Sequence, residues 1–192
     1  MTDTSHVLPQ ALHDLGAALW FGGSVMGVAG VNKSGADLRD GLDKVRVAGS
    51  AWQRFAPVQW TGIATVLVAG TQLTRASKGR LAMQHGWARA GSTKAGVAVA
   101  GAAATAYAAY TGKKISEVAE RLDRSGRPVD VQDASVSTSG TPAELASWQK
   151  KQRVAQLLVP LLSGANVVLN SYLVQTSRPG ATARGLLRSL VR

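Results

Sequence analysis

The chain has 192 residues, which is enough for one compact unit and does not require a second domain. It contains no cysteine, so disulfides, thiol catalysis and thiolate-bound metal centres are excluded. The 22 Lys and Arg outnumber the 11 Asp and Glu, giving a net charge of +11. These cations flank apolar stretches and accompany no nucleic-acid-binding motif, so we expect lipid headgroups and no nucleic acid as their partners.

Four stretches free of charged residues dominate the sequence. A helix needs about 20 mostly apolar residues to cross the ~30 Å hydrocarbon core of a bilayer. The sequence therefore predicts an all-α fold, a polytopic four-helix transmembrane bundle with amphipathic helical extensions. We expect one membrane domain over residues 1–192, with spans at about 12–32, 55–74, 95–112 and 154–177. The alternative is a soluble Ala-rich bundle, but its helices would carry charge along their outer faces.

The first span combines small residues with one ionisable ring. On a helical wheel, His13, Gly16, Trp20, Gly23 and Gly27 share one narrow sector. Small residues let helix backbones approach closely in lipid, so this sector predicts a packing interface. The expected interface residues are Gly16, Trp20, Gly23 and Gly27, joined by Gly96 and Gly101 of the third span. An ionisable residue so placed is a candidate for function, although His13 could also simply bond to a neighbouring helix or a headgroup.

The segment His13–Gly23, HDLGAALWFGG, resembles the opening helix of small bacterial four-helix membrane proteins of the copper-resistance-D-like kind. The chain is also similar to four-helix membrane proteins of high-GC actinobacteria. The first resemblance implies metal transport or haem-type redox work, with further histidines in later helices. The other histidines, His6 and His85, lie outside the expected spans, so we expect no metal site and no haem or copper cofactor.

Amphipathic and irregular segments connect the spans. Residues 37–54 show apolar side chains at three- and four-residue spacing, which predicts an amphipathic helix leading into the second span. The Ser/Gly/Asp/Pro-rich residues 123–141 predict a flexible loop. Thr141 and Glu144 predict a capping box at the start of the last helix. Residues 181–192 predict a basic amphipathic tail on the membrane surface.

Polar side chains within the spans predict a possible polar site. They project inward because an amide facing lipid is costly, and they serve either as structural hydrogen bonds or as a ligand site. The candidates are His13, Gln59, Gln156, Ser163, Asn166 and Asn170. Basic residues at the span ends predict contacts with lipid headgroups, namely Lys94, Lys113, Lys114, Arg184 and Arg188.

The sequence holds no hydrolase, zinc-protease or phosphate-loop motif. We therefore expect a non-enzymatic accessory, scaffold or assembly subunit that packs against other membrane subunits or against itself. Two alternatives stay open: a haem- or metal-handling redox protein that uses His13, and a transporter of small solutes or lipids lined by Gln59, Asn166 and Asn170. Composition predicts a multi-pass protein of a bacterial plasma membrane. Thirteen Lys and Arg on one side against nine on the other favour both termini outside.

Overall fold

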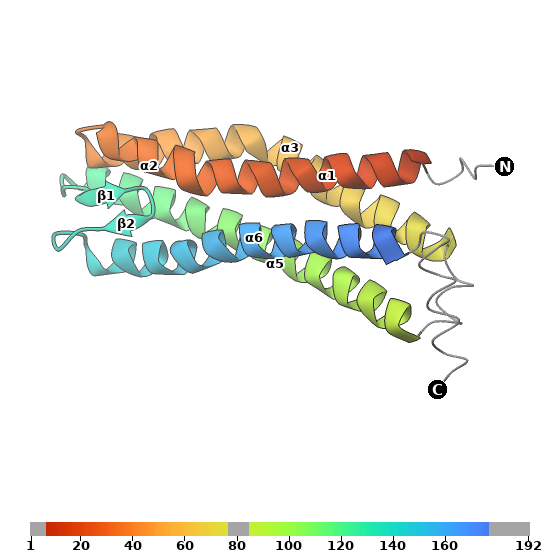
Figure 1. The fold of residues 1–192 in the computed structure, drawn as a ribbon. Coiled ribbons are helices and arrows are strands. Elements are labelled where there is room, and N and C mark those ends of the chain that lie inside the picture. Colours follow the sequence, from red (N-terminus) through yellow and green to blue (C-terminus); the bar gives the residue numbers. More distant parts are fainter. Residues whose placement is uncertain (1–6, 77–84, 177–192) are drawn as a thin grey trace.

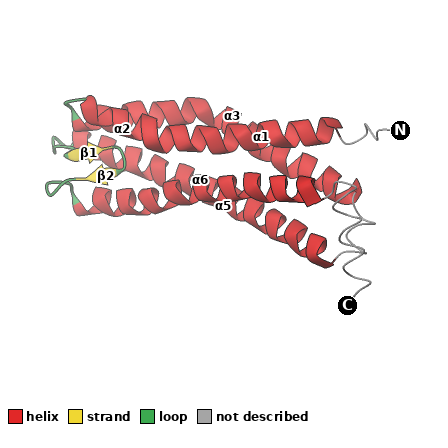
Figure 2. Cartoon of the chain, viewed as in Figure 1, coloured by secondary structure: helices red, strands yellow, loops and turns green. Residues whose placement is uncertain are grey.

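The computed structural model describes residues 7–76 and 85–176. Four long helices run along one another (Figures 1 and 2): α1 Val7–Met26, α3 Gly41–Ala76, α5 His85–Arg124 and α6 Ala143–Thr176. The prediction of an all-α fold is confirmed. Helix α1 packs mainly against α3 and α5 mainly against α6, while fewer contacts join the two pairs.

Short helical segments extend α1 to the far end of the bundle. A π-helix, η2 (Gly27–Val31), is followed by α2 (Asn32–Ser34) and a 3₁₀ turn, η3 (Gly35–Asp37). Helix α3 then runs back without a break, so the predicted amphipathic lead and the second predicted span form one helix.

A two-stranded hairpin stands where the sequence analysis assigned only a loop. Strands β1 (Val131–Asp133) and β2 (Val136–Ser137) pair antiparallel between α5 and α6. The Thr141 hydroxyl, predicted to cap α6, instead accepts a hydrogen bond from the Thr138 N–H at 2.8 Å and donates to the Asp130 carbonyl. The hairpin therefore holds this hydroxyl within the loop.

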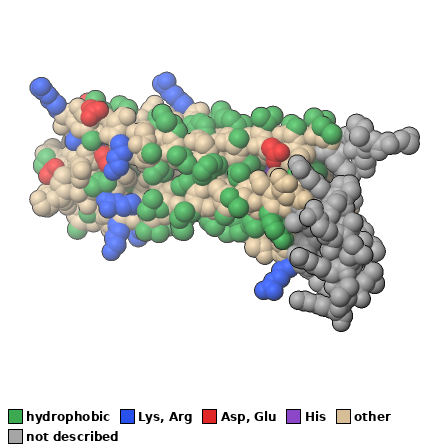
Figure 3. Space-filling view, in the orientation of Figure 1, with side chains coloured by type: hydrophobic (Ala, Val, Ile, Leu, Met, Phe, Trp, Pro, Cys, Tyr) green, Lys and Arg blue, Asp and Glu red, His purple; other side chains and the backbone are tan. Residues whose placement is uncertain are grey.

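The bundle divides along its length into two sections. The apolar section comprises residues 7–31, 55–76, 85–112 and 154–176, and the polar section comprises residues 32–54 and 113–153. In the sequence of the apolar section, the Asp, Glu, Lys and Arg residues are Asp14, Arg75, Arg89 and Lys94. On the face seen in Figure 3, most charged side chains gather around the hairpin end, while hydrophobic side chains cover the length of the helices.

Two segments among the described residues are long and apolar enough to cross a membrane, Val7–Asp37 and Ala143–Gln175. Only 28% and 22% of their most apolar windows are buried inside the protein, so these windows mostly face outward. Helices α3 and α5 are less hydropathic than these two segments. The uncharged stretch of α3 carries Gln59, Gln72 and four threonines, and that of α5 consists largely of Ala and Gly. The four-span arrangement remains a prediction.

Each section has its own apolar core. In the polar section, large aliphatic side chains pack between the helices and the hairpin: Leu42, Val45, Ile115, Val118, Leu122, Val131 and Leu145. In the apolar section, a smaller cluster surrounds the fully buried Trp20: Ala17, Ile63, Val66 and Val159.

Candidate functional site

A cavity of about 310 Å³ lies inside the bundle where the two sections meet. Helices α3 and α5 face it with small side chains, among them Ala56, Ala108 and Gly112. Small residues on both walls leave space that neither helix fills, which accounts for the cavity at this level. Gln53, Trp60, Ala109 and Lys113 line the cavity and are also exposed, so its opening lies between α3 and α5.

One wall of the cavity is a network of amide side chains. Asn32 donates from Nδ2 to Gln156 Oε1 at 2.9 Å, and the Trp52 indole N–H donates to Asn32 Oδ1 at 2.9 Å. Thr111 donates to Gln152 Oε1 beside them. The two bonds of Asn32 join α2 to α6 and to α3. The bond of Thr111 joins α5 to α6.

A second layer of polar contacts lies one to two turns deeper in the apolar section. Gln59 Nε2 donates to the Ser24 hydroxyl at 3.2 Å, and Ser24 donates to the Trp20 carbonyl at 2.6 Å. The Trp20 indole N–H donates to the Thr105 hydroxyl at 3.2 Å. The buried indole is thus fixed between α1 and α5.

Three amide atoms along this cavity make no hydrogen bond with any described residue: Gln59 Oε1, Gln152 Nε2 and Gln156 Nε2. Two of them are donors and one is an acceptor. Because the three residues line the cavity, these atoms offer hydrogen-bonding capacity to whatever occupies it.

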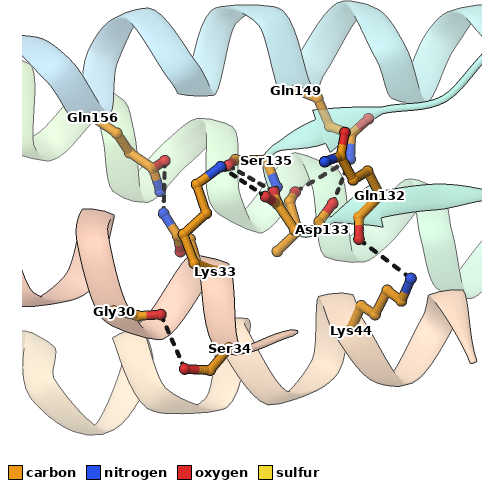
Figure 4. Close-up of polar contacts among 11 residues, drawn as sticks. Gly30, Lys33, Ser34, Lys44, Gln132, Asp133, Ser135, Gln149 and Gln156 are labelled. Atoms are coloured by element: carbon orange, nitrogen blue, oxygen red, sulfur yellow. Dashed lines mark hydrogen bonds and ion pairs between the residues drawn. The ribbon is translucent and has the colours of Figure 1, made fainter. Parts of the chain in front are cut away.

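The hairpin closes the polar end of the cavity with Ala134 and Ser135. Asp133, 1% exposed, accepts hydrogen bonds from the Ser135 N–H at 2.7 Å and from the Ser135 hydroxyl at 3.0 Å, and Lys33 Nζ lies 3.2 Å from its other oxygen. Gln149 and Lys44 donate to backbone carbonyls of the hairpin (Figure 4). These contacts join the hairpin to α2 through Lys33, to α3 through Lys44 and to α6 through Gln149.

A separate polar cluster lies near the start of α1. His13 is fully buried, and its Nδ1 lies 3.5 Å from Asp14 Oδ1. The same carboxylate oxygen accepts from Asn170 Nδ2 at 2.7 Å, while Asn170 Oδ1 accepts from Lys94 Nζ at 2.6 Å. Asn166 donates to the Lys94 carbonyl at 3.5 Å. The cluster links α1, α5 and α6.

The structure therefore divides the predicted polar site into two places. Gln59 and Gln156 line the cavity, whereas His13, Asn166 and Asn170 belong to the cluster near the start of α1. Ser163 is buried and donates to the Val159 carbonyl of its own helix at 2.8 Å. Within the described part of the chain, no group of three or more His, Cys, Asp or Glu is arranged to hold a metal ion.

The predicted glycine seam packs against the chain itself. A Cβ on Gly16 would lie 2.7 Å from the Gly62 carbonyl oxygen of α3. One on Gly23 would overlap the Phe55 ring, and one on Gly27 the Trp52 ring. Gly101 similarly faces Trp20, but a Cβ on Gly96 would meet nothing within 4 Å.

Among the predicted headgroup residues, Lys94 lies half-buried against Asn170, and Lys113 is exposed at the rim of the cavity. Lys114 pairs with Glu117 at 2.7 Å. Arg184, Arg188 and the predicted tail lie outside the described residues.

Asn32, Trp52 and Gln152 are site residues that the sequence analysis did not select. Gln149, Gln152 and Gln156 recur at spacings of three and four residues on α6, a pattern that places all three on one helix face. That spacing was the available indication of an amide wall.

No protein-family model, curated protein or solved structure matches this chain. The case for its function therefore depends on the geometry described above.

Proposed function

We propose that this protein is a four-helix integral membrane protein that binds an uncharged, hydroxyl-bearing amphiphile in its internal cavity. The observation that carries the proposal is the cavity itself, with three unpaired amide atoms from Gln59, Gln152 and Gln156 on an otherwise largely apolar lining.

The outer surface supports the membrane part of the proposal. Large apolar or aromatic side chains are exposed on all four long helices, including the two that fall short by composition. On α3 these are Val58, Leu67 and Val68, and on α5 they are Val99, Tyr107 and Tyr110. Extended exposed apolar surface is rare on soluble monomers and is the expected surface toward acyl chains.

The lining supports the chemical class of the ligand. The only charged residue among the lining residues is Lys113, which is at the rim. An ion without a partner is costly to bury, so the enclosed part of the ligand is neutral. A hydroxyl group can accept from an amide NH₂ and donate to an amide oxygen, and it therefore satisfies both kinds of free atom. The Ala, Val, Ile and Trp side chains of the lining suit an apolar chain.

The position of the opening supports entry from the bilayer. Gln53 and Lys113 lie at the polar end of the opening, and Trp60 and Ala109 lie toward the apolar section. An amphiphile resting at the level of the membrane interface would present its polar end and its chain in the same order.

Quenching of tryptophan fluorescence tests the proposal, because Trp52 and Trp60 line the cavity. The probes are a bromine-tagged long-chain alcohol and the bromoalkane of the same length, added to protein in mild detergent. We expect the alcohol to bind about tenfold more tightly, since two net hydrogen bonds of ~0.7 kcal/mol each contribute about 1.4 kcal/mol.

Two matched variants make this experiment specific. Ala56→Leu fills the cavity and should weaken quenching, whereas Ala64→Leu places the same side chain on the exposed surface of the same helix. Equal quenching by alcohol and alkane would remove the hydroxyl requirement. Unchanged quenching in Ala56→Leu would show that the probe does not occupy this cavity.

A second candidate function is that of an accessory subunit, and the open position of Gly96 on α5 favours it. Gly16, Gly23 and Gly27 are already covered by α3, so a partner helix would have to use this other surface. In that case Gly96→Leu, unlike Gly22→Leu on α1, should release a co-purifying membrane protein.

The proposed orientation places both termini outside, and labelling from each side of the membrane tests it. The haem or copper alternative predicts a visible absorption band that is lost in His13→Ala.

A further inference from the structure

His13 is an ionisable ring enclosed in the apolar section with neither nitrogen paired to a described residue. Gly70 of α3 lies beside the ring, where a Cβ would be in ordinary van der Waals contact with His13 Cδ2 at 3.6 Å. A neutral imidazole has one donor and one acceptor nitrogen, and leaving both unpaired costs free energy. Both ring nitrogens are therefore free to bind a proton or a hydrogen-bonding partner, in a buried position where leaving them unpaired is energetically unfavourable.

The neighbours of the ring form a hydrogen-bonded chain across three helices. Asp14 Oδ1 lies 3.5 Å from His13 Nδ1 and also accepts from Asn170 and from Gln10 Nε2, the latter at 2.8 Å. Asn170 in turn accepts from Lys94. Asn170 thus stands between the carboxylate and the ammonium group.

The charged groups around His13 act in opposite directions. Burial of the ring and Lys94 on α5 oppose a cationic ring, and Asp14 on α1 favours one. Helix α6 contributes Asn166 and Asn170, and α3 contributes Gly70, none of which ionises. A metal ion on the ring would need further ligands, which the described residues do not supply as a cluster. A proton needs only the carboxylate already in place.

We propose that His13 is a proton-binding site within the apolar section. The neutral ring carries a hydrogen on one nitrogen and a free lone pair on the other. The incoming proton binds the nitrogen with the lone pair, and the resulting imidazolium has an Nδ1–H that faces Asp14 Oδ1. Asp14, with 54% of its side chain exposed, is the group through which the proton arrives.

Proton binding at His13 alters the contact between α1 and α6. The Asp14 oxygen that accepts from Asn170 is then shared with the imidazolium, so the bond between the two helices weakens. Lys94 keeps its own bond to Asn170. The site thereby couples the charge of one ring to the packing of α1 against α6.

The small number of histidines makes the test direct. The chain has three, so His6→Gln with His85→Gln leaves His13 as the single ¹⁵N-labelled imidazole. Ring ¹⁵N shifts are followed from about pH 3 to about pH 8, a range that covers the usual titration of histidine and extends below it, because burial opposes the cation. We expect the ring to take up one proton and to carry hydrogen on both nitrogens. A ring that keeps one charge state wherever the protein is folded would overturn the proposal.

Charge variants identify the neighbours that act on the ring. The ring should take up its proton at a lower pH in Asp14→Asn and at a higher pH in Lys94→Gln, by about one pH unit each. Lys150→Gln removes an exposed charge on α6, twenty residues or about 30 Å along the helix from Asn170, and should change nothing. If Asp14→Asn does not fold, the titration of the native protein and that of Lys94→Gln still test the proposal. If His13 takes up its proton at the same pH in Lys94→Gln as in the native protein, Lys94 does not act on the ring and the assigned cluster is wrong.

Discussion

The apolar and polar sections differ in what they expose and in how many polar side chains they bury. In the polar section, Leu, Val and Ile side chains fill the interior, and charged side chains lie mostly outside. In the apolar section, large aliphatic side chains point outward, while the buried polar residues include His13, Ser24, Gln59, Thr105, Ser163, Asn166 and Asn170. Both sections therefore have an apolar core, but the exposed surface is mostly charged and polar at one end and largely aliphatic at the other, where most of the buried polar residues also lie. The membrane proposal explains this difference by a change of solvent from water to lipid along the same helices.

The cavity lies where these two arrangements meet. Asn32 and Gln152 of the amide wall belong to the polar section, and Gln156, Gln59 and Trp60 belong to the apolar section. A ligand that bridges them must itself be polar at one end and apolar at the other.

The largest expected effect comes from breaking the close contact between α1 and α3. Gly16→Leu forces a side chain toward the Gly62 backbone carbonyl, which cannot rotate away. We expect a loss of about 3 kcal/mol or more, measured as a lower thermal midpoint in mild detergent. Gly22→Leu is the control, because a Cβ there meets nothing within 4 Å, and it should unfold like the native protein. Equal loss in both variants would mean that the contact is not tight.

A charge placed on the outer surface should distinguish the two sections. Leu161 in the apolar section and Val47 in the polar section are both well exposed, at 67% and 52%. If lipid surrounds only the first, Leu161→Lys should cost about 2–3 kcal/mol and reduce the amount of protein in the membrane fraction. Val47→Lys should leave that amount unchanged. Similar yields for the two variants would argue against a difference in solvent.

The hairpin contact tests how firmly the polar section closes the cavity. Asp133→Ala leaves the Ser135 N–H and the Lys33 ammonium without their acceptor, so we expect a loss of about 2 kcal/mol. Hydrogen exchange should rise first at residues 131–137. Lys33→Gln serves as the comparison and should cost less, because Lys33 is largely exposed and surface ion pairs contribute little. Unchanged exchange in Asp133→Ala would show that the hairpin is held by other contacts.

The smallest effect is expected at the exposed Lys114–Glu117 pair. The hydrogen bond from Lys114 lowers the pKa of Glu117, and the same bond raises the pKa of Lys114. A lowered carboxyl pKa gives stability that is present above the unfolded-state pKa and is lost as the pH falls through the folded-state pKa. Because both groups are in water, Lys114→Gln should barely change the thermal midpoint at neutral pH. The fall of the thermal midpoint as the pH is lowered should also be nearly the same as in the native protein. A shift comparable to that of Asp133→Ala would mean that the pair is not solvated.

Sequence reasoning recovered the helices because their patterns are local. Uncharged runs and the three- and four-residue spacing of residues 37–54 depend on near neighbours, and the structure has helices there. The sector of Gly16, Gly23 and Gly27 was readable for the same reason, but its partner, α3 of the same chain, was not.

The rest depends on contacts between residues far apart in sequence. The hairpin is short, and it is held by Lys33 and Gln149, which lie 100 and 16 residues from Asp133. The cavity arises where Ala and Gly residues of α3 and α5 meet, and neither helix reveals it alone. Likewise, Gln59 and Asn170 are both amides within predicted spans, but they lie in different sites. Which site each one joins depends on how the helices are aligned when they pack, and the sequence alone does not give that alignment.

Labelling of single cysteines tests the central account most directly, since the native chain contains none. Leu67→Cys on α3 and Val99→Cys on α5 place a thiol on the outer surface of the two helices that fall short by composition. Because maleimides react with the hydrated thiolate, these positions should stay unlabelled in permeabilised membranes and react after solubilisation in SDS, while Val47→Cys reacts in both. If Leu67→Cys and Val99→Cys react in membranes as fast as Val47→Cys, water surrounds these helices and the four-helix membrane account is contradicted.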